Sequence, residues 1–69
     1  MYVTGNVCKV VVDKGYAFIR VPGGADIFCH AGQLRDLEFD EQLTERRVRF
    51  EIDHRSGRPR AKDVYAAAD

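Results

Sequence analysis

The chain has 69 residues, of which 45% are apolar, and its 11 basic and 11 acidic residues give a formal charge of zero. A chain of this length buries one thin core and has no room for a deep catalytic pocket beside it, so we expect one domain over residues 1–69 and no enzymatic activity. No leader segment and no apolar run of membrane-spanning length is visible, so we expect a cytoplasmic protein with reduced thiols and no membrane contact.

The first half of the chain predicts three strands separated by turns. Residues 2–12 are rich in β-branched side chains and end in three valines, which indicates a buried strand. A turn at residues 13–15 ends this strand, and residues 16–21 then alternate between two faces. A second turn at residues 22–24 leads into a short strand over residues 26–30. The side chains that the alternation places inside are Ala17, Ile19, Val21, Ile27 and Cys29.

The segment that follows has little regular structure. Residues 31–37 are long enough for about one helical turn, which Leu34 and Leu37 could dock on the core because they lie three positions apart. Residues 36–45 contain five acids and no base and show no strong alternation, so we interpret them as a loop. A helix over residues 40–47 is the alternative.

Two more strands complete the predicted fold. Residues 46–53 alternate again, and after a turn at residues 56–59 a fifth strand covers residues 60–67. The side chains expected inside are Val48, Phe50, Ile52, Ala61, Val64 and, as a further candidate, Tyr65. Five short strands and one helical turn after the third predict an all-β fold, either an antiparallel barrel or a meander. Closure into a barrel would remove the exposed edges.

Ring-bearing side chains remain on the outer face of the second and third predicted strands. They are Tyr16, Phe18, Phe28 and His30. An exposed aromatic cluster normally marks a binding surface. Flat rings beside Lys9, Lys14 and Arg20 suit unstacked bases, because bases stack on rings and cations meet phosphates. The pattern therefore predicts a platform for single-stranded nucleic acid, and a second core or a dimer interface is the alternative.

Two motifs in this region resemble a known family. Residues 14–19, Lys-Gly-Tyr-Ala-Phe-Ile, resemble the first nucleic-acid-binding motif of the cold-shock domain, and residues 26–30, Asp-Ile-Phe-Cys-His, resemble the second. Gly5-Asn6-Val7 and the segments 48–51 and 57–61 match other parts of the family pattern. The resemblance covers nearly the whole chain. It implies a five-stranded OB-type barrel that binds single-stranded RNA or DNA and acts as an RNA chaperone or a regulator of gene expression.

The resemblance also implies which residues bind. It places Lys14, Tyr16, Phe18, Phe28 and His30 on family binding positions. Phe39 falls on a loop aromatic that often adds a stacking surface, while Arg58 and Arg60 lie near the basic contacts of the last turn. Lys9 and Arg20 join this predicted site as flanking cations.

The first strand departs from the family pattern. Where the family typically has Lys-Trp-Phe-Asn, residues 8–11 are Cys-Lys-Val-Val, so that Lys9 replaces a stacking Trp. Ala31 and Gly32 stand where the family often has an aromatic and a serine, and Ala17 replaces the usual glycine. We therefore expect a reduced stacking surface with a basic rim, and binding that is weaker or differently tuned than the family norm.

Other functions have less support in the sequence. Cys8, Cys29, His30 and His54 match no zinc signature, so we expect neither a metal nor a cofactor. The rival function is a protein-interaction module, in which the acidic residues 36–45 would bind a basic partner.

The remaining arginines and the oligomeric state are less defined. Arg46 and Arg47 are interpreted as ordinary surface charges, whereas a phosphate contact by Arg55 stays open. The expected oligomeric state is a monomer or a weak homodimer.

Overall fold

The computed structural model describes residues 2–55 and 57–67, and their regular structure consists of β-strands and short 3₁₀ turns. The strands are β1 (Val3–Val11), β2 (Tyr16–Arg20), β3 (Asp26–His30), β4 (Arg47–Asp53) and β5 (Arg60–Ala66). The turns are η1 (Val12–Lys14), η2 (Ala31–Gln33) and η3 (Glu41–Leu43). No helix in this part of the chain is long and apolar enough to cross a membrane.

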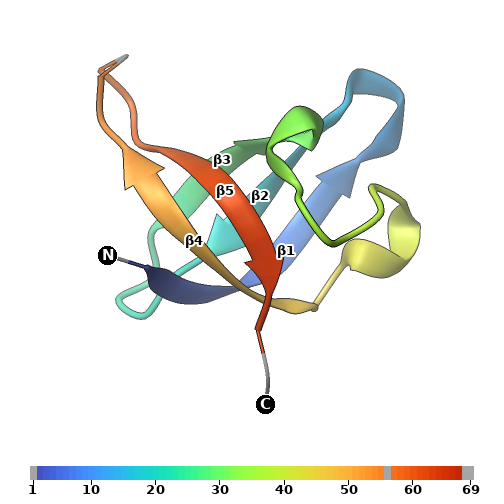
Figure 1. Cartoon of the computed structure of the whole chain (residues 1–69), viewed down its shortest axis with the longest axis horizontal. Helices are drawn as coiled ribbons and strands as arrows, with labels where there is room; N and C mark the ends of the chain where they lie inside the picture. The colour runs from blue at the N-terminus through green and yellow to red at the C-terminus, as the bar shows by residue number, and fades with distance from the viewer. Residues whose placement is uncertain (1, 56, 68–69) are drawn as a thin grey trace.

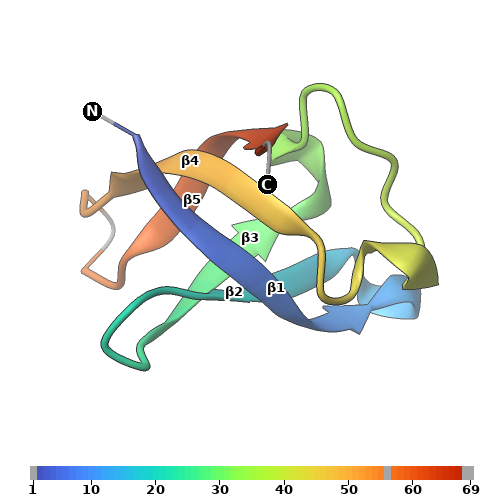
Figure 2. The same cartoon turned by 90° about the horizontal axis from the view of Figure 1, so that it is seen from below.

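The strands form a closed barrel in the order β1-β2-β3-β5-β4 (Figures 1 and 2). Strand β1 closes it by pairing antiparallel with β4 along its first half and with β2 along its second half. The predicted five-stranded barrel is thus confirmed. One pair differs from the antiparallel prediction, because β3 and β5 run parallel and are joined through only two residue pairs, Phe28 with Arg60 and Cys29 with Ala61.

The predicted connections are mostly confirmed. The helical turn after the third strand is η2, which is shorter than the predicted segment 31–37. Leu34 and Leu37 pack against the core as expected, but both lie beyond the turn, and Leu34 forms a β-bridge with Val64. Residues 36–45 form a loop that contains only the short turn η3, and the alternative helix over residues 40–47 does not form. The turn at residues 56–59 begins at Ser56, which lies outside the described residues.

Two irregularities set which side chains face outward. In β1, Val7 pairs with Ile19 and Lys9 pairs with Phe18, so Cys8 is an extra residue in a β-bulge. This shift puts Lys9 on the outer face beside Phe18.

Val12 does not continue the buried strand as predicted, because it lies in η1 and is 46% exposed.

A second shift lies in β5, at Asp63, whose φ is 51°. Because this bulge adds a residue, Ala61 and Val64 both point inward although they lie three positions apart. Tyr65 then points outward and pairs with the exposed Arg49. The prediction of Tyr65 as a third buried side chain is therefore wrong.

The barrel interior is filled by a small apolar core. Its buried members are Val7, Ala17, Ile19, Ile27, Cys29, Leu43, Val48, Phe50, Ala61 and Val64. Val21 and Ile52, which were predicted inside, are half-buried and pack against it. Leu43 joins the core from η3, a contact that strand alternation could not reveal because the residue lies in a loop.

Among the glycines, Gly5 has the least room for a side chain. A Cβ atom added there would lie 2.7 Å from the Arg20 carbonyl oxygen and 2.9 Å from Ile19 Cγ2. We therefore expect Gly5→Ala to lower the free energy of unfolding by about 1–3 kcal/mol, because the neighbouring backbone of β2 must shift. Urea denaturation followed by circular dichroism measures this change. The exposed neighbour provides the control, since Asn6→Ala should change stability little; equal effects at the two positions would contradict the steric argument.

Candidate nucleic-acid interface

The register of β2 against β3 brings the predicted rings together. Phe18 lies directly opposite Phe28, and Tyr16 lies directly opposite His30. The inward partners of the same strands, Ala17 opposite Cys29 and Ile19 opposite Ile27, are buried. The rings therefore share the outer face because the core uses the alternate positions.

Tyr16, Phe18 and Phe28 contact one another and form a cluster, which we call the ring platform. The Tyr16 and Phe28 centroids are 5.3 Å apart, those of Tyr16 and Phe18 are 5.7 Å apart, and those of Phe18 and Phe28 are 5.9 Å apart. Both pairs that involve Phe18 meet edge to face. All three side chains are half-buried, so each ring is held by its neighbours and still presents part of its surface to solvent.

Cations border the ring platform on both sides. Lys9 on β1 pairs with Phe18, and Arg60 on β5 pairs with Phe28, so the order across four strands is Lys9, Phe18, Phe28, Arg60. The Arg60 Cζ lies 5.5 Å from the Phe28 ring centroid, which is a cation–π distance. Lys14 is exposed in η1, just before Tyr16.

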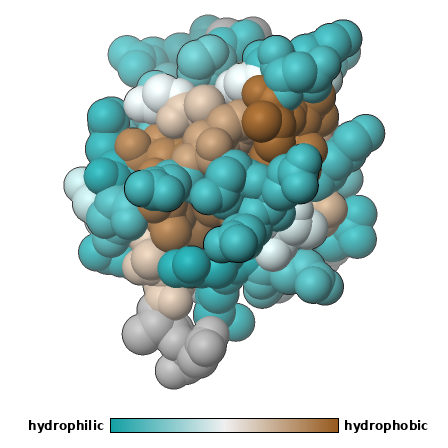
Figure 3. All heavy atoms as spheres, turned by 90° about the vertical axis from the view of Figure 1, so that its right-hand side faces the viewer, coloured by the Kyte–Doolittle hydropathy of each residue, from teal (hydrophilic) through white to brown (hydrophobic). Residues whose placement is uncertain are grey.

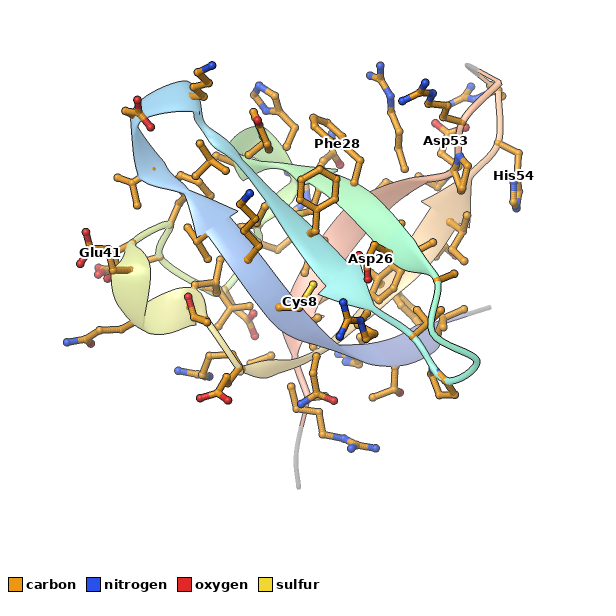
Figure 4. The ribbon with its side chains drawn as sticks, turned by 180° about the vertical axis from the view of Figure 1, so that it is seen from behind. Cys8, Asp26, Phe28, Glu41, Asp53 and His54 are labelled. Atoms are coloured by element: carbon orange, nitrogen blue, oxygen red, sulfur yellow. The ribbon has the colours of Figure 1, made fainter. Side chains whose placement is uncertain are left out.

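A groove runs over the ring platform toward the turn before β5. It is lined by Tyr16, Phe18, Asp26, Phe28, Arg58, Pro59 and Arg60. Figure 4 shows the same side of the barrel, with Phe28, Asp26 and Cys8 lying over β1, β2 and β3. Asp26 and Pro59 were not among the predicted site residues. The register could have revealed Asp26, because it lies opposite Arg20 on the same outer face.

Arg20 is not an unpaired cation. Its Nε donates to Asp26 Oδ1 at 3.0 Å, and this bond with the adjacent positive charge lowers the pKa of the Asp26 carboxyl. The Cys8 thiol lies 3.8 Å from the same carboxylate oxygen. A phosphate that approaches Arg20 would have to compete with Asp26, so this pair separates Arg20 from the other predicted cations.

His30 is fixed by a backbone contact. Its Nδ1 accepts a hydrogen bond from the Gly32 N–H at 3.0 Å, which caps η2. Because Nδ1 is the acceptor, the neutral ring carries its proton on Nε2, which can donate to a ligand. The backbone N–H of Gly32, at a position where the family often has serine, thus orients the ring of His30.

Phe39 is not part of the ring platform. Its half-buried ring packs against the core, and among the described residues it makes no ring contact with Tyr16, Phe18 or Phe28. The structure therefore does not bring this predicted stacking residue together with the others.

The cysteines and histidines do not converge. No group of three or more His, Cys, Asp or Glu side chains in the described ranges could hold a metal ion. Burial raises the pKa of the Cys29 thiol to about 11, so this group stays protonated and inert at neutral pH.

Comparisons with known proteins match most of the chain. A family model described as the 'Cold-shock' DNA-binding domain matches residues 3–67, which include all five strands. The major cold shock protein CspA of Bacillus cereus is 38% identical over 64 residues, which cover 93% of this chain and 96% of that protein. The cold shock-like protein CspE of Bacillus anthracis is 34% identical over 64 residues, with the same coverage of both chains. The cold shock protein CspB of Geobacillus stearothermophilus is 36% identical over 52 residues, or 75% of this chain and 79% of that protein.

Arg55, in the turn before β5, is paired with an aspartate at the end of β4. Arg55 donates to Asp53 through its backbone N–H at 2.9 Å and its Nε at 3.1 Å, and these bonds lower the pKa of Asp53 to about 2. We expect Arg55→Ala to raise this pKa toward the ordinary value of about 3.9. The lowered pKa means that the contact stabilises the fold above the ordinary pKa and is lost as pH falls toward 2. Carboxyl titration by NMR measures the pKa, with Arg46→Ala as control; an unchanged value in Arg55→Ala would exclude this pairing in solution.

Proposed function

Because the chain belongs to the cold-shock domain family, we propose that it binds single-stranded RNA or DNA on the ring platform, without catalysis. Its role would be that of an RNA chaperone or a regulator of gene expression. One observation carries the proposal, namely the row of Lys9, Phe18, Phe28 and Arg60 across four adjacent strands. Rings in the middle and cations at both ends match the bases and phosphates of a single strand.

The rings would act by stacking. Bases that stack on Phe18 and Phe28 cannot at the same time stack within a duplex, so binding keeps the strand unpaired. Stacking is sequence-tolerant, because every base has a flat face, and it is worth about 1–3 kcal/mol per base. A chaperone needs this kind of contact, which holds many sequences and releases each of them.

Polar groups near the rings would add selectivity. The Asp26 carboxylate lines the groove and can accept from a base amino group, while His30 Nε2–H can donate to a base or a phosphate. Arg58 and Arg60 at the other end of the groove would contact phosphates. Phe39 packs against the core and, within the described residues, makes no ring contact with the platform residues, so it would contact a bound nucleic-acid strand outside the ring platform.

A protein partner is the second candidate, supported by the surface around η1. Figure 3 faces the end of the barrel where η1 and η3 lie and shows an apolar patch bordered by hydrophilic atoms. A shallow depression there is lined by Val10, Val11, Val12 and Glu41 among others, and Val12 is 46% exposed. Two acids and two lysines, Asp13, Glu41, Lys9 and Lys14, also line this depression, so its apolar side chains rather than its charge would carry the contact with a protein partner.

Ring removal tests the stacking face. We expect Phe28→Ala to weaken binding of a fluorescently labelled pyrimidine-rich single strand by about 5- to 150-fold, the equivalent of one stacked base. Fluorescence anisotropy measures the affinity, and Arg46→Ala, which removes an exposed charge away from the groove, is the control. Equal effects of the two variants would argue against a stacking face, and no binding at tens of micromolar in low salt would exclude the proposed function.

Salt dependence tests the basic rim. If Lys9, Lys14, Arg58 and Arg60 each neutralise a phosphate, the logarithm of the binding constant should fall with the logarithm of salt concentration with a slope of about −3, at about −0.7 per contact. Lys9→Ala should reduce this slope by about 0.7 with little effect on the free energy of unfolding, because Lys9 is exposed. The same titrations at several salt concentrations give the slope. A slope near zero would mean that these cations do not meet phosphates.

A further inference from the structure

Arg49 on β4 contacts two tyrosine rings outside the ring platform. Its Cζ is 5.0 Å from the Tyr2 ring centroid and 4.9 Å from the Tyr65 ring centroid. The two rings meet edge to face, with centroids 6.2 Å apart. Tyr2 is 46% exposed, Arg49 is exposed and Tyr65 is half-buried, so this group, which we call the tyrosine–arginine cluster, is accessible to a ligand.

Within the part of the chain that the structure describes, Arg49 has no ion-pair partner, in contrast to Arg20, Arg35 and Arg55. Glu51, the nearest acid along β4, pairs with Lys62 at 3.8 Å. The two rings contact the guanidinium through cation–π interactions, which do not use its N–H donors, so these donors can bind an anion.

The cluster and the ring platform lie on different sides of the barrel and are joined by β5. Strand β4 is on the near side in Figure 1, whereas Phe28 is on the near side in Figure 4, which is the view from behind. Strand β5 lies between β3 and β4. Its Arg60 stands over Phe28, and its Tyr65 stands against Arg49. Arg60 and Tyr65 are five positions apart on β5, which corresponds to about 16 Å at a rise of about 3.3 Å per residue.

We propose that the tyrosine–arginine cluster is a second contact for the nucleic-acid strand that occupies the ring platform. The strand would leave the platform at Arg60, pass Lys62 and place a phosphate on Arg49 and a base against an exposed tyrosine ring. This inference rests on the proposed function, because it extends the same bound strand. The route has a cation against a ring at each end, Arg60 over Phe28 and Arg49 against Tyr2 and Tyr65, and a single strand needs both kinds of contact.

The length of the ligand tests this inference. An oligonucleotide of about 6 nucleotides is sufficient for the platform, whereas one of about 14 nucleotides can extend over β5, within the known range of site sizes for barrels of this class. We expect the long oligonucleotide to bind more tightly than the short one at the same salt concentration. Arg49→Ala should weaken binding of the long oligonucleotide by about 5- to 30-fold and leave that of the short one unchanged.

Two further variants complete the experiment. Tyr2→Ala removes an exposed ring at the start of the chain and should also weaken only long-oligonucleotide binding, so the inference can be tested even if Arg49→Ala is destabilised. Arg46→Ala removes the same charge outside the cluster and should affect neither length by more than a small factor. Thermal unfolding of each variant shows whether the fold is intact.

The outcomes separate this inference from the proposed function. If neither oligonucleotide binds, or if Phe28→Ala has no effect on either, the proposed function fails and this inference fails with it. If both bind and depend on Phe28, but Arg49→Ala and Tyr2→Ala affect both lengths equally or neither, only the second contact is excluded.

Discussion

The narrow interior of the barrel is the constraint on which the other features depend. The chain contains three tyrosines and four phenylalanines, and among them only Phe50 is buried. The remaining interior is filled by smaller side chains such as Ala17, Val48 and Ala61. A closed barrel of five short strands has room for few large rings, so the other aromatic side chains must lie on its surface or at its ends. The ring platform is therefore a consequence of how the core is packed.

The 11 basic and 11 acidic residues, which give zero net charge, are unevenly arranged in the structure. Arg20, Arg35 and Arg55 are each paired with an aspartate, which removes them from the charges available to a ligand. The acids of residues 36–45 lie in the loop around η3, whereas Lys9 and Arg60 border the rings. A neutral protein can thus present a basic rim to phosphates, because the field at a surface depends on the local arrangement and is screened over about 10 Å.

Strong local patterns made much of the fold predictable. Alternation located β2 and β3 and the buried side chains within them, and the two motifs indicated the cold-shock family, which the family match and the relatives confirm. The bulges at Cys8 and Asp63 were not predictable, because one extra residue changes which side chains face outward without changing composition. The outward position of Tyr65 follows from the second bulge.

The candidate site was predictable to a similar extent. The rings of the platform were identified from their strand positions alone, whereas the pairing of Arg20 with Asp26 and the packing of Phe39 on the core depend on contacts that sequence spacing does not encode.

The short parallel pairing of β3 with β5 has a further consequence. Strands β3 and β5 are joined through two residue pairs, whereas every other pair of neighbouring strands has four or five. The line of contact between β3 and β5, which we call the seam, therefore has the least backbone support in the sheet. Phe28 and Arg60 stand on opposite sides of it. A nucleic-acid strand that binds both residues would hold β3 and β5 together. Binding would then slow the exchange of backbone amide hydrogens along the seam with solvent.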